Sequence, residues 1–197
     1  GAMLTITRDS IMSLEDYTKV RQDFRARVMS HKKNRKVFLG ENITFIFEDE
    51  LTIRYHIQEM LRIEKIFEEK EIIEEINAYK ALLPSGNNWK VTMMIEYPDP
   101  VIRADKLKKL LGIENMIWVK IAAYDPVFGI ADEDLDRSTD EKTSAVHFLC
   151  FNLKKEMIAA LYNGASLSMG CEHPAYSAQI DKIDKLISDS LVNDLDD

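Results

Sequence analysis

Two carboxylates and one histidine are the residues of this chain best suited to acid–base catalysis: Glu59, Glu96 and His173. Pro174 restricts His173 to extended backbone, and we expect the imidazole at a junction between a strand and a helix, where sites are common. If a helix covered Glu96, burial would raise its pKa and make it a candidate base. Convergence of the three side chains in one pocket would indicate an enzyme or a metal-dependent sensor. The alternative is a capping histidine and two solvated carboxylates.

Soft-metal ligands are few in this chain: His147, Cys150, Cys171 and His173. Side chains three apart in a strand point to opposite faces, which separates His147 from Cys150. Cys171 and His173 can face the same way, so these two are our candidate metal ligands. We nevertheless expect no resident cofactor, and we interpret both cysteines as buried and unreactive.

Motifs of common enzyme classes are absent from the sequence. It contains no Gly-rich phosphate loop, nucleophile elbow, paired-cysteine knuckle or dinucleotide fingerprint. His56 and Glu59 lie three residues apart on a predicted helix and could share a metal, but we favour a solvated helix face as their explanation. The absence of these motifs favours a non-enzymatic protein.

Charge is distributed unevenly along the chain, whose net charge is −8. Residues 19–36 hold eight basic residues and one acidic residue, whereas residues 41–75 hold eleven acidic and four basic residues. The basic segment could meet an acidic partner protein, or dock on the acidic segment of its own or a second copy of the chain. Nucleic-acid binding ranks last, because no aromatic platform or known module accompanies the basic helix. The candidate binding residues are Arg25, Arg27, Lys32, Lys33, Arg35, Arg54 and Arg62.

Composition indicates one globular domain over residues 3–197, with Gly1-Ala2 interpreted as a remnant of expression. Of the 197 residues, 46% are hydrophobic and 30% charged, which is too apolar for disorder. No apolar run approaches the roughly 18 residues that span a bilayer. Two cysteines do not form a disulfide framework. We therefore expect a cytoplasmic protein with reduced thiols and no membrane contact.

Caps and hydrophobic periodicity predict a helix-hairpin-helix-helix part over 14–83. Ser13 is a suitable N-cap for the first helix. Glu48-Asp49-Glu50 places negative charge at the start of the second. The predicted elements are a helix over 14–31, a hairpin over 36–39 and 43–47, and helices over 51–66 and 70–82.

A sheet-and-helix part is predicted over 89–192. Its elements are strands over 89–97, 116–124, 145–153 and 166–171, and helices ending at 111, over 154–163 and over 176–191. Residues 145–153 are apolar on both faces, which predicts a central strand, whereas the alternation in 166–171 predicts an edge strand. We expect an α+β fold with a mainly antiparallel sheet flanked by helices, against which the N-terminal helix and β-hairpin pack.

Five segments carry a family resemblance in order over almost the whole chain: Phe38–Gly40, Thr44–Glu48, Ile53–Arg62, Ile95–Asp99 and His173–Tyr176. They resemble the bacterial domain-of-unknown-function family 3501, which has no established activity. Members of that family are often encoded beside rubrerythrin-like proteins and iron–sulfur oxidoreductases. The resemblance therefore implies an accessory or binding protein of redox or peroxide-stress metabolism, with such a protein as partner. The two cysteines here cannot hold a four-cysteine cluster.

Overall fold

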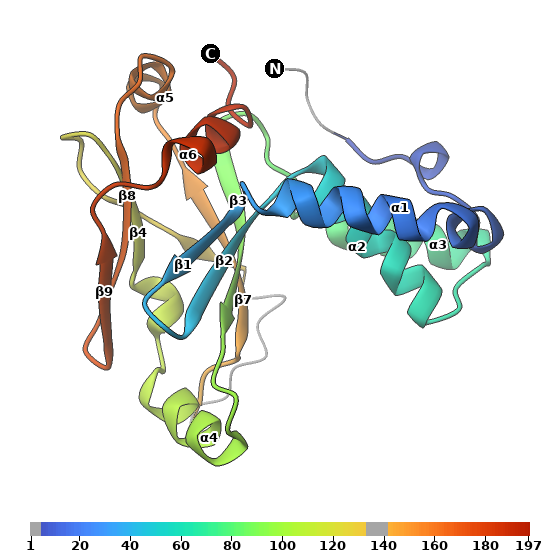
Figure 1. Cartoon of the computed structure of the whole chain (residues 1–197), viewed down its shortest axis with the longest axis horizontal. Coiled ribbons are helices and arrows are strands. Elements are labelled where there is room, and N and C mark those ends of the chain that lie inside the picture. Colours follow the sequence, from blue (N-terminus) through green and yellow to red (C-terminus); the bar gives the residue numbers. More distant parts are fainter. Residues whose placement is uncertain (1–4, 133–141) are drawn as a thin grey trace.

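The computed structural model describes residues 5–132 and 142–197, and these form an α+β fold, as predicted (Figure 1). Its helices are η1 (Arg8–Ser10), α1 (Leu14–Lys32), α2 (Glu50–Ile63), α3 (Glu69–Lys80), α4 (Pro100–Lys109), η2 (Ile113–Asn115), α5 (Lys155–Tyr162) and α6 (Lys185–Val192). Its strands are β1 (Lys36–Leu39), β2 (Ile43–Glu48), β3 (Asn88–Ile95), β4 (Ile117–Ile121), β5 (Val127–Phe128), β6 (Ile130–Ala131), β7 (Val146–Asn152), β8 (Leu167–His173) and β9 (Tyr176–Ile180).

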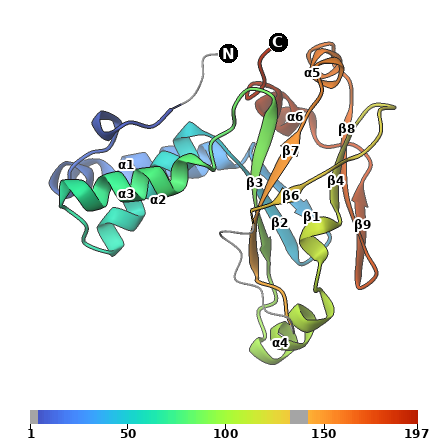
Figure 2. The ribbon, with the colours of Figure 1, turned by 180° about the vertical axis from the view of Figure 1, so that it is seen from behind.

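A helical lobe, made of η1 and α1–α3, extends sideways from the strands (Figures 1 and 2). Helix α2 is central to the lobe because two of its faces are buried. Ile53 and Ile57 pack in a cluster that includes Ile72 of α3, while Tyr55 packs with Phe24 of α1. The predicted Ser13 cap forms, with the Ser13 side chain accepting the Asp16 N–H at 3.1 Å. Asp49, predicted only as negative charge at the start of α2, is the N-cap of that helix and accepts the Thr52 N–H at 3.1 Å.

The strands form two antiparallel sheets. The first sheet has the order β1-β2-β3-β7-β6, and the second has the order β5-β4-β8-β9. The main core lies between them and includes Phe47 and Trp89 from the first sheet with Val119 and Met169 from the second. Gly129 links β5 of the second sheet to β6 of the first. A Cβ at this position would lie 3.0 Å from the Phe151 ring, so any residue other than glycine would require that ring to move.

Two predictions about the sheet were wrong. One sheet was expected, but the strands divide into two, and the β1–β2 hairpin belongs to the first sheet instead of packing against it. Strand β8 was expected at an edge, but it pairs with β4 on one side and β9 on the other. Small residues such as Gly170 suggested exposure, whereas the ring of Trp118 occupies the space beside that glycine.

The predicted helix over 176–191 was also wrong in its first half. Residues Tyr176–Ile180 form β9, and α6 begins only at Lys185. Tyr176 and Ile180 are four residues apart, which suits a helix, but Ala178 lies between them at the two-residue step of a strand. Because Tyr176 also donates a hydrogen bond to the Leu39 carbonyl, β9 closes against the end of β1.

Some predicted features lie outside the described residues. One is the expected remnant of expression, Gly1-Ala2; the other is an acidic stretch of the sequence, expected as a loop, that includes Glu133, Asp134, Asp136, Asp140 and Glu141. The other predicted elements are confirmed, with ends that differ by a few residues. Across residues 5–132 and 142–197, no helix is both long enough and apolar enough to cross a membrane.

Candidate binding pocket between the helices and the first sheet

The outer face of the first sheet carries a continuous row of side chains. Lys36 pairs with Ile46, Ile46 with Thr92, and Thr92 with Phe148, so the row crosses β1, β2, β3 and β7. Alternate residues of a strand face opposite sides. The row therefore lies on the face opposite the main core, which is the face beside the helical lobe.

The base of the helical lobe covers this row and encloses a pocket of about 340 Å³. Helix α1 contributes Met29 and Lys32, α2 contributes Ile53 and His56, and Leu82 follows α3. Small-molecule sites have volumes of about 300–1,000 Å³ and mostly apolar walls with a few polar groups. The pocket has both properties, since its polar side chains are Lys32, Lys36, Glu48, His56 and Thr92.

Glu48 and His56 line this pocket, and both have shifted pKa values. Burial raises the pKa of Glu48 to about 7, against the opposing attraction of Lys32. Thr92 lies beside it, with its hydroxyl 3.4 Å from the Glu48 carboxylate. His56 is exposed at the rim of the pocket, but partial loss of solvent lowers its pKa, and Lys32 lowers it further. Near neutral pH, His56 is therefore uncharged while Glu48 is near its midpoint of titration.

Lys32 and Lys36 bring positive charge to the pocket without a direct ion pair among the described residues. The ammonium of Lys32 lies 5.6 Å from the centre of the Tyr55 ring, and that of Lys36 lies 6.0 Å from the Phe38 ring. Neither ammonium forms an ion pair or hydrogen bond with any residue that the structure describes. Cation–π contacts hold the two lysines in place but leave their donors available to a ligand.

A buried ionic network fixes the junction between the lobe and the first sheet. The Arg35 side chain is 1% exposed and its Nε donates to the Phe47 carbonyl at 2.8 Å. Its guanidinium also pairs with Asp194, whose pKa is raised by burial although Arg35 opposes the shift. His31 lies 2.6 Å from Asp49, which caps α2. Arg35 was expected on a partner-binding surface; its burial contradicts that role.

The candidate acid–base residues have separate surroundings. Glu59 joins α1 to α2: it accepts a hydrogen bond from the Tyr17 hydroxyl at 2.7 Å and two from Arg21, which lowers the Glu59 pKa. Glu96 accepts a hydrogen bond from Thr44 at 2.6 Å, beside β2.

His173 serves the hairpin between β8 and β9. Its Nε2 lies 2.8 Å from the Leu111 carbonyl, and its Nδ1 accepts the Ala175 N–H at 3.0 Å. This is the capping role named above as the alternative. Among the described residues, no hydrogen bond or ion pair joins any two of Glu59, Glu96 and His173, and none of the three lines the pocket.

The two cysteines lie in different surroundings. Cys150 faces outward with its thiol 3.4 Å from Asn152, while Cys171 is buried in the main core. Burial raises the pKa of both thiols. In the part of the chain that the structure describes, no three His, Cys, Asp or Glu side chains are grouped to hold a metal ion.

The remaining basic candidates differ in availability. Arg25, Arg27 and Lys33 are exposed and have no ion pair among the described residues. Arg62 is exposed too. Arg54 is engaged within the lobe, because it pairs with Glu50 at 2.6 Å and its guanidinium lies 5.2 Å from the Phe24 ring centre.

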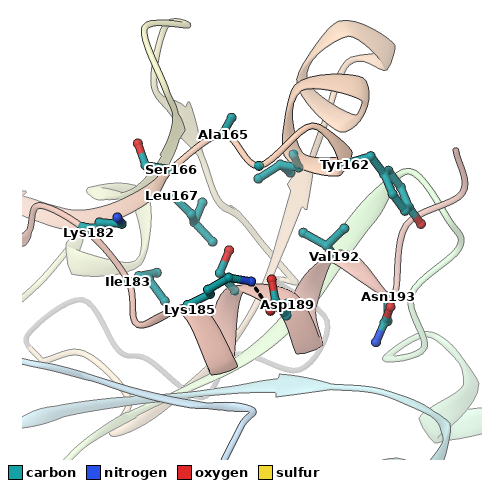
Figure 3. A pocket seen from close by; sticks show the side chains of 13 residues that line it. Tyr162, Ala165, Ser166, Leu167, Lys182, Ile183, Lys185, Asp189, Val192 and Asn193 are labelled. Carbon is teal, nitrogen blue, oxygen red and sulfur yellow. Dashed lines mark hydrogen bonds and ion pairs between the residues drawn. The ribbon is translucent and has the colours of Figure 1, made fainter.

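A larger pocket of about 480 Å³ lies between α5, the start of β8 and α6 (Figure 3). Its charged side chains include Lys185 and Asp189, which pair with each other at 2.7 Å while remaining 83% and 61% exposed. Because this pair is satisfied and solvated, we favour the smaller pocket, where Lys32 and Lys36 are unpaired and Glu48 has a shifted pKa.

Sequence reasoning missed most of the pocket. Lys32 was named as a binding residue for an acidic partner, His56 as a metal candidate and Glu48 only as negative charge at a helix start. Lys36 and Phe148 were not singled out. One signal was present: residues 145–153 are apolar on both faces, which means that the outer face of that strand must be covered. Nothing local indicated that the cover would be α1 and α2.

The chain was compared with family models, solved structures and curated proteins. A family model described as "Protein of unknown function (DUF3501)" matches residues 5–195. A crystal structure of a protein of unknown function from Burkholderia pseudomallei is 51% identical, with a TM-score of 0.93. The match covers 98% of this chain and 100% of that one. Among curated proteins, none is significantly similar to this chain.

Proposed function

Since the chain belongs to the DUF3501 family, whose description states no activity, we propose a function from the geometry. The protein is a non-enzymatic binding protein that holds a small, largely apolar molecule between its helical lobe and its first sheet. One observation carries this proposal, namely the apolar pocket of about 340 Å³ at the junction of the two parts. Ligand sites form preferentially at such junctions.

A neutral dye tests the proposal without assuming a charged ligand. Phenylnaphthylamine, whose emission rises in apolar surroundings, should bind to the wild-type protein. Val146 lines the pocket and is 41% exposed, so Val146→Trp should fill the pocket from its rim and abolish the emission. Val101→Trp is the matched control, because Val101 is 79% exposed on α4 and is not part of the pocket. Equal emission from both variants, or none from the wild type, would contradict the proposal.

A second candidate function is that of an accessory protein for a bacterial redox or peroxide-stress enzyme in the cytoplasm. The exposed Arg25, Arg27 and Lys33 favour it, because unpaired cations on one helix suit an acidic partner. The link to redox metabolism rests on the family resemblance alone. This candidate is compatible with the first, since Arg25 and Arg27 lie on α1, which also contributes to the pocket wall, and Lys33 follows that helix directly.

A further inference from the structure

We propose that the molecule held in this pocket is a medium-chain carboxylic acid, bound with its carboxylate at Lys32 and Lys36 and its apolar body against Met94 and Phe148. The inference rests on the proposed binding function and adds the chemical class of the ligand. It follows from the charges around the pocket, which favour one kind of head group.

The charged groups of the pocket favour an anion. Lys32 and Lys36 line it without ion-pair partners among the described residues, and His56 is uncharged near neutral pH because its pKa is lowered. A carboxylate would accept charge-assisted hydrogen bonds from the two ammonium groups. An ammonium head group would be repelled, and an alcohol would leave both lysines without a counter-charge.

The walls favour an apolar body attached to that anion. Beyond the charged side chains, the pocket is lined by residues such as Met29, Ile46, Ile53, Met94 and Phe148. Methionine side chains are flexible and adapt to ligands of different shape. A free inorganic anion would satisfy the lysines but leave these surfaces uncovered, so the structure points to an amphiphile.

Glu48 should make the binding depend on pH. Other charged groups near it are Lys32 on α1, Lys36 on β1, Arg35 and Asp49 beside its own strand, and Lys90 directly across on β3; His56 on α2 also lines the pocket. When protonated, Glu48 can donate a hydrogen bond to the bound carboxylate. When ionised, it repels that carboxylate and competes for the lysines. Affinity for the acid should therefore fall as the pH rises through about 7.

Calorimetric titration with octanoate, octanol and octylamine tests the class of ligand. Since a hydrogen bond to a charged group contributes about 1.5–3 kcal/mol, octanoate should bind at least about tenfold more tightly than octanol, with octylamine weakest. Lys32→Met and Lys36→Met should each reduce this preference. Lys19→Met, an exposed lysine of the same helix outside the pocket, should leave it unchanged. Thermal melts of all variants check that they fold.

The outcomes separate this inference from the proposed function. If octanol binds as tightly as octanoate, or if Lys32→Met and Lys36→Met leave the preference intact, the carboxylic-acid assignment is wrong while the binding pocket stands. If none of the three molecules binds and phenylnaphthylamine does not bind either, the proposed function itself fails.

Discussion

The guanidinium of Arg35 donates two parallel hydrogen bonds to the carboxylate of Asp194, at 3.0 and 2.5 Å, across 159 residues of sequence. Arg35 immediately precedes β1, and Asp194 follows α6. The same guanidinium also donates to the carbonyls of Phe47 and Glu48 on β2. One buried side chain thus joins the end of the basic helix, the first sheet and the C-terminal turn.

Removing Arg35 alone should strongly destabilise the fold. Arg35→Met leaves the Asp194 carboxylate buried without its partner, which typically costs about 3–5 kcal/mol. The double variant with Asp194→Asn no longer buries that carboxylate, and Asp49, the other carboxylate near Arg35, keeps His31 as a partner, so the double variant should be more stable than Arg35→Met. Urea denaturation measures the free energy of unfolding of both. A double variant no more stable than Arg35→Met would show that the pair has no such role.

Glu59 should behave as a structural residue. Its carboxylate accepts the hydroxyl of Tyr17, a residue that is 1% exposed. Glu59→Ala leaves that hydroxyl without its acceptor and should lower the free energy of unfolding by about 1–3 kcal/mol. In a Tyr17→Phe background the same change should cost less, because no hydroxyl remains to be satisfied. Equal losses in the two backgrounds would contradict this role.

Glu48 should make stability depend on pH in a predictable direction. Its pKa is about 7 in the folded protein and 4.5 at its ordinary value. Between these values the unfolded chain loses its proton while the folded chain keeps it, so the destabilisation grows as the pH rises from 4.5 to about 7 and then levels off.

Glu48→Gln removes this ionisation. The variant should therefore be more stable than the wild type at about pH 8, by at most about 3 kcal/mol, and nearly equal to it at about pH 4. Urea denaturation at both pH values measures the difference. A gain in stability that is as large at the acidic pH would rule out ionisation of Glu48 as its cause.

Local signals in the sequence predicted most elements because those elements depend on neighbours. The Ser13 cap acts within three residues, so the start of α1 could be predicted, and the acidic charge of residues 48–50 indicated the start of α2. Tyr176 and Ile180 could not be assigned in the same way. Two residues four apart lie on the same face of a helix, and they also lie on the same face of a strand. Pairing with β8 decided the outcome.

The candidate site could not be predicted, because its members come together only in the tertiary structure. Arg35 and Lys33 are both basic and two residues apart, yet one is buried against Asp194 and the other is exposed. Glu48 looks like an ordinary helix-start acid in the sequence. Its shifted pKa comes from burial between the first sheet and helices that pack beside it.

The accessory role predicts binding to an acidic redox protein through the exposed cations. Reversing Arg25, Arg27 and Lys33 to Glu should weaken the affinity for a purified rubrerythrin-like protein by at least about tenfold, and added salt should weaken the wild-type interaction. Three reversals elsewhere, at Lys108, Lys154 and Lys155, keep the same net charge as a control. Surface plasmon resonance measures both variants. Unchanged affinity after reversal of Arg25, Arg27 and Lys33 would contradict the accessory role.

The most direct test of the binding pocket is a methyl NMR titration of methionine-labelled protein with octanoate and octanol. Met29 and Met94 line the pocket, whereas Met93, the neighbour of Met94 on the opposite face of β3, lies in the main core. We predict saturable shifts of the Met29 and Met94 methyl signals, with Met93 nearly unchanged. Signals of Met29 and Met94 that stay fixed, or that move no more than Met93, would contradict binding between the helical lobe and the first sheet.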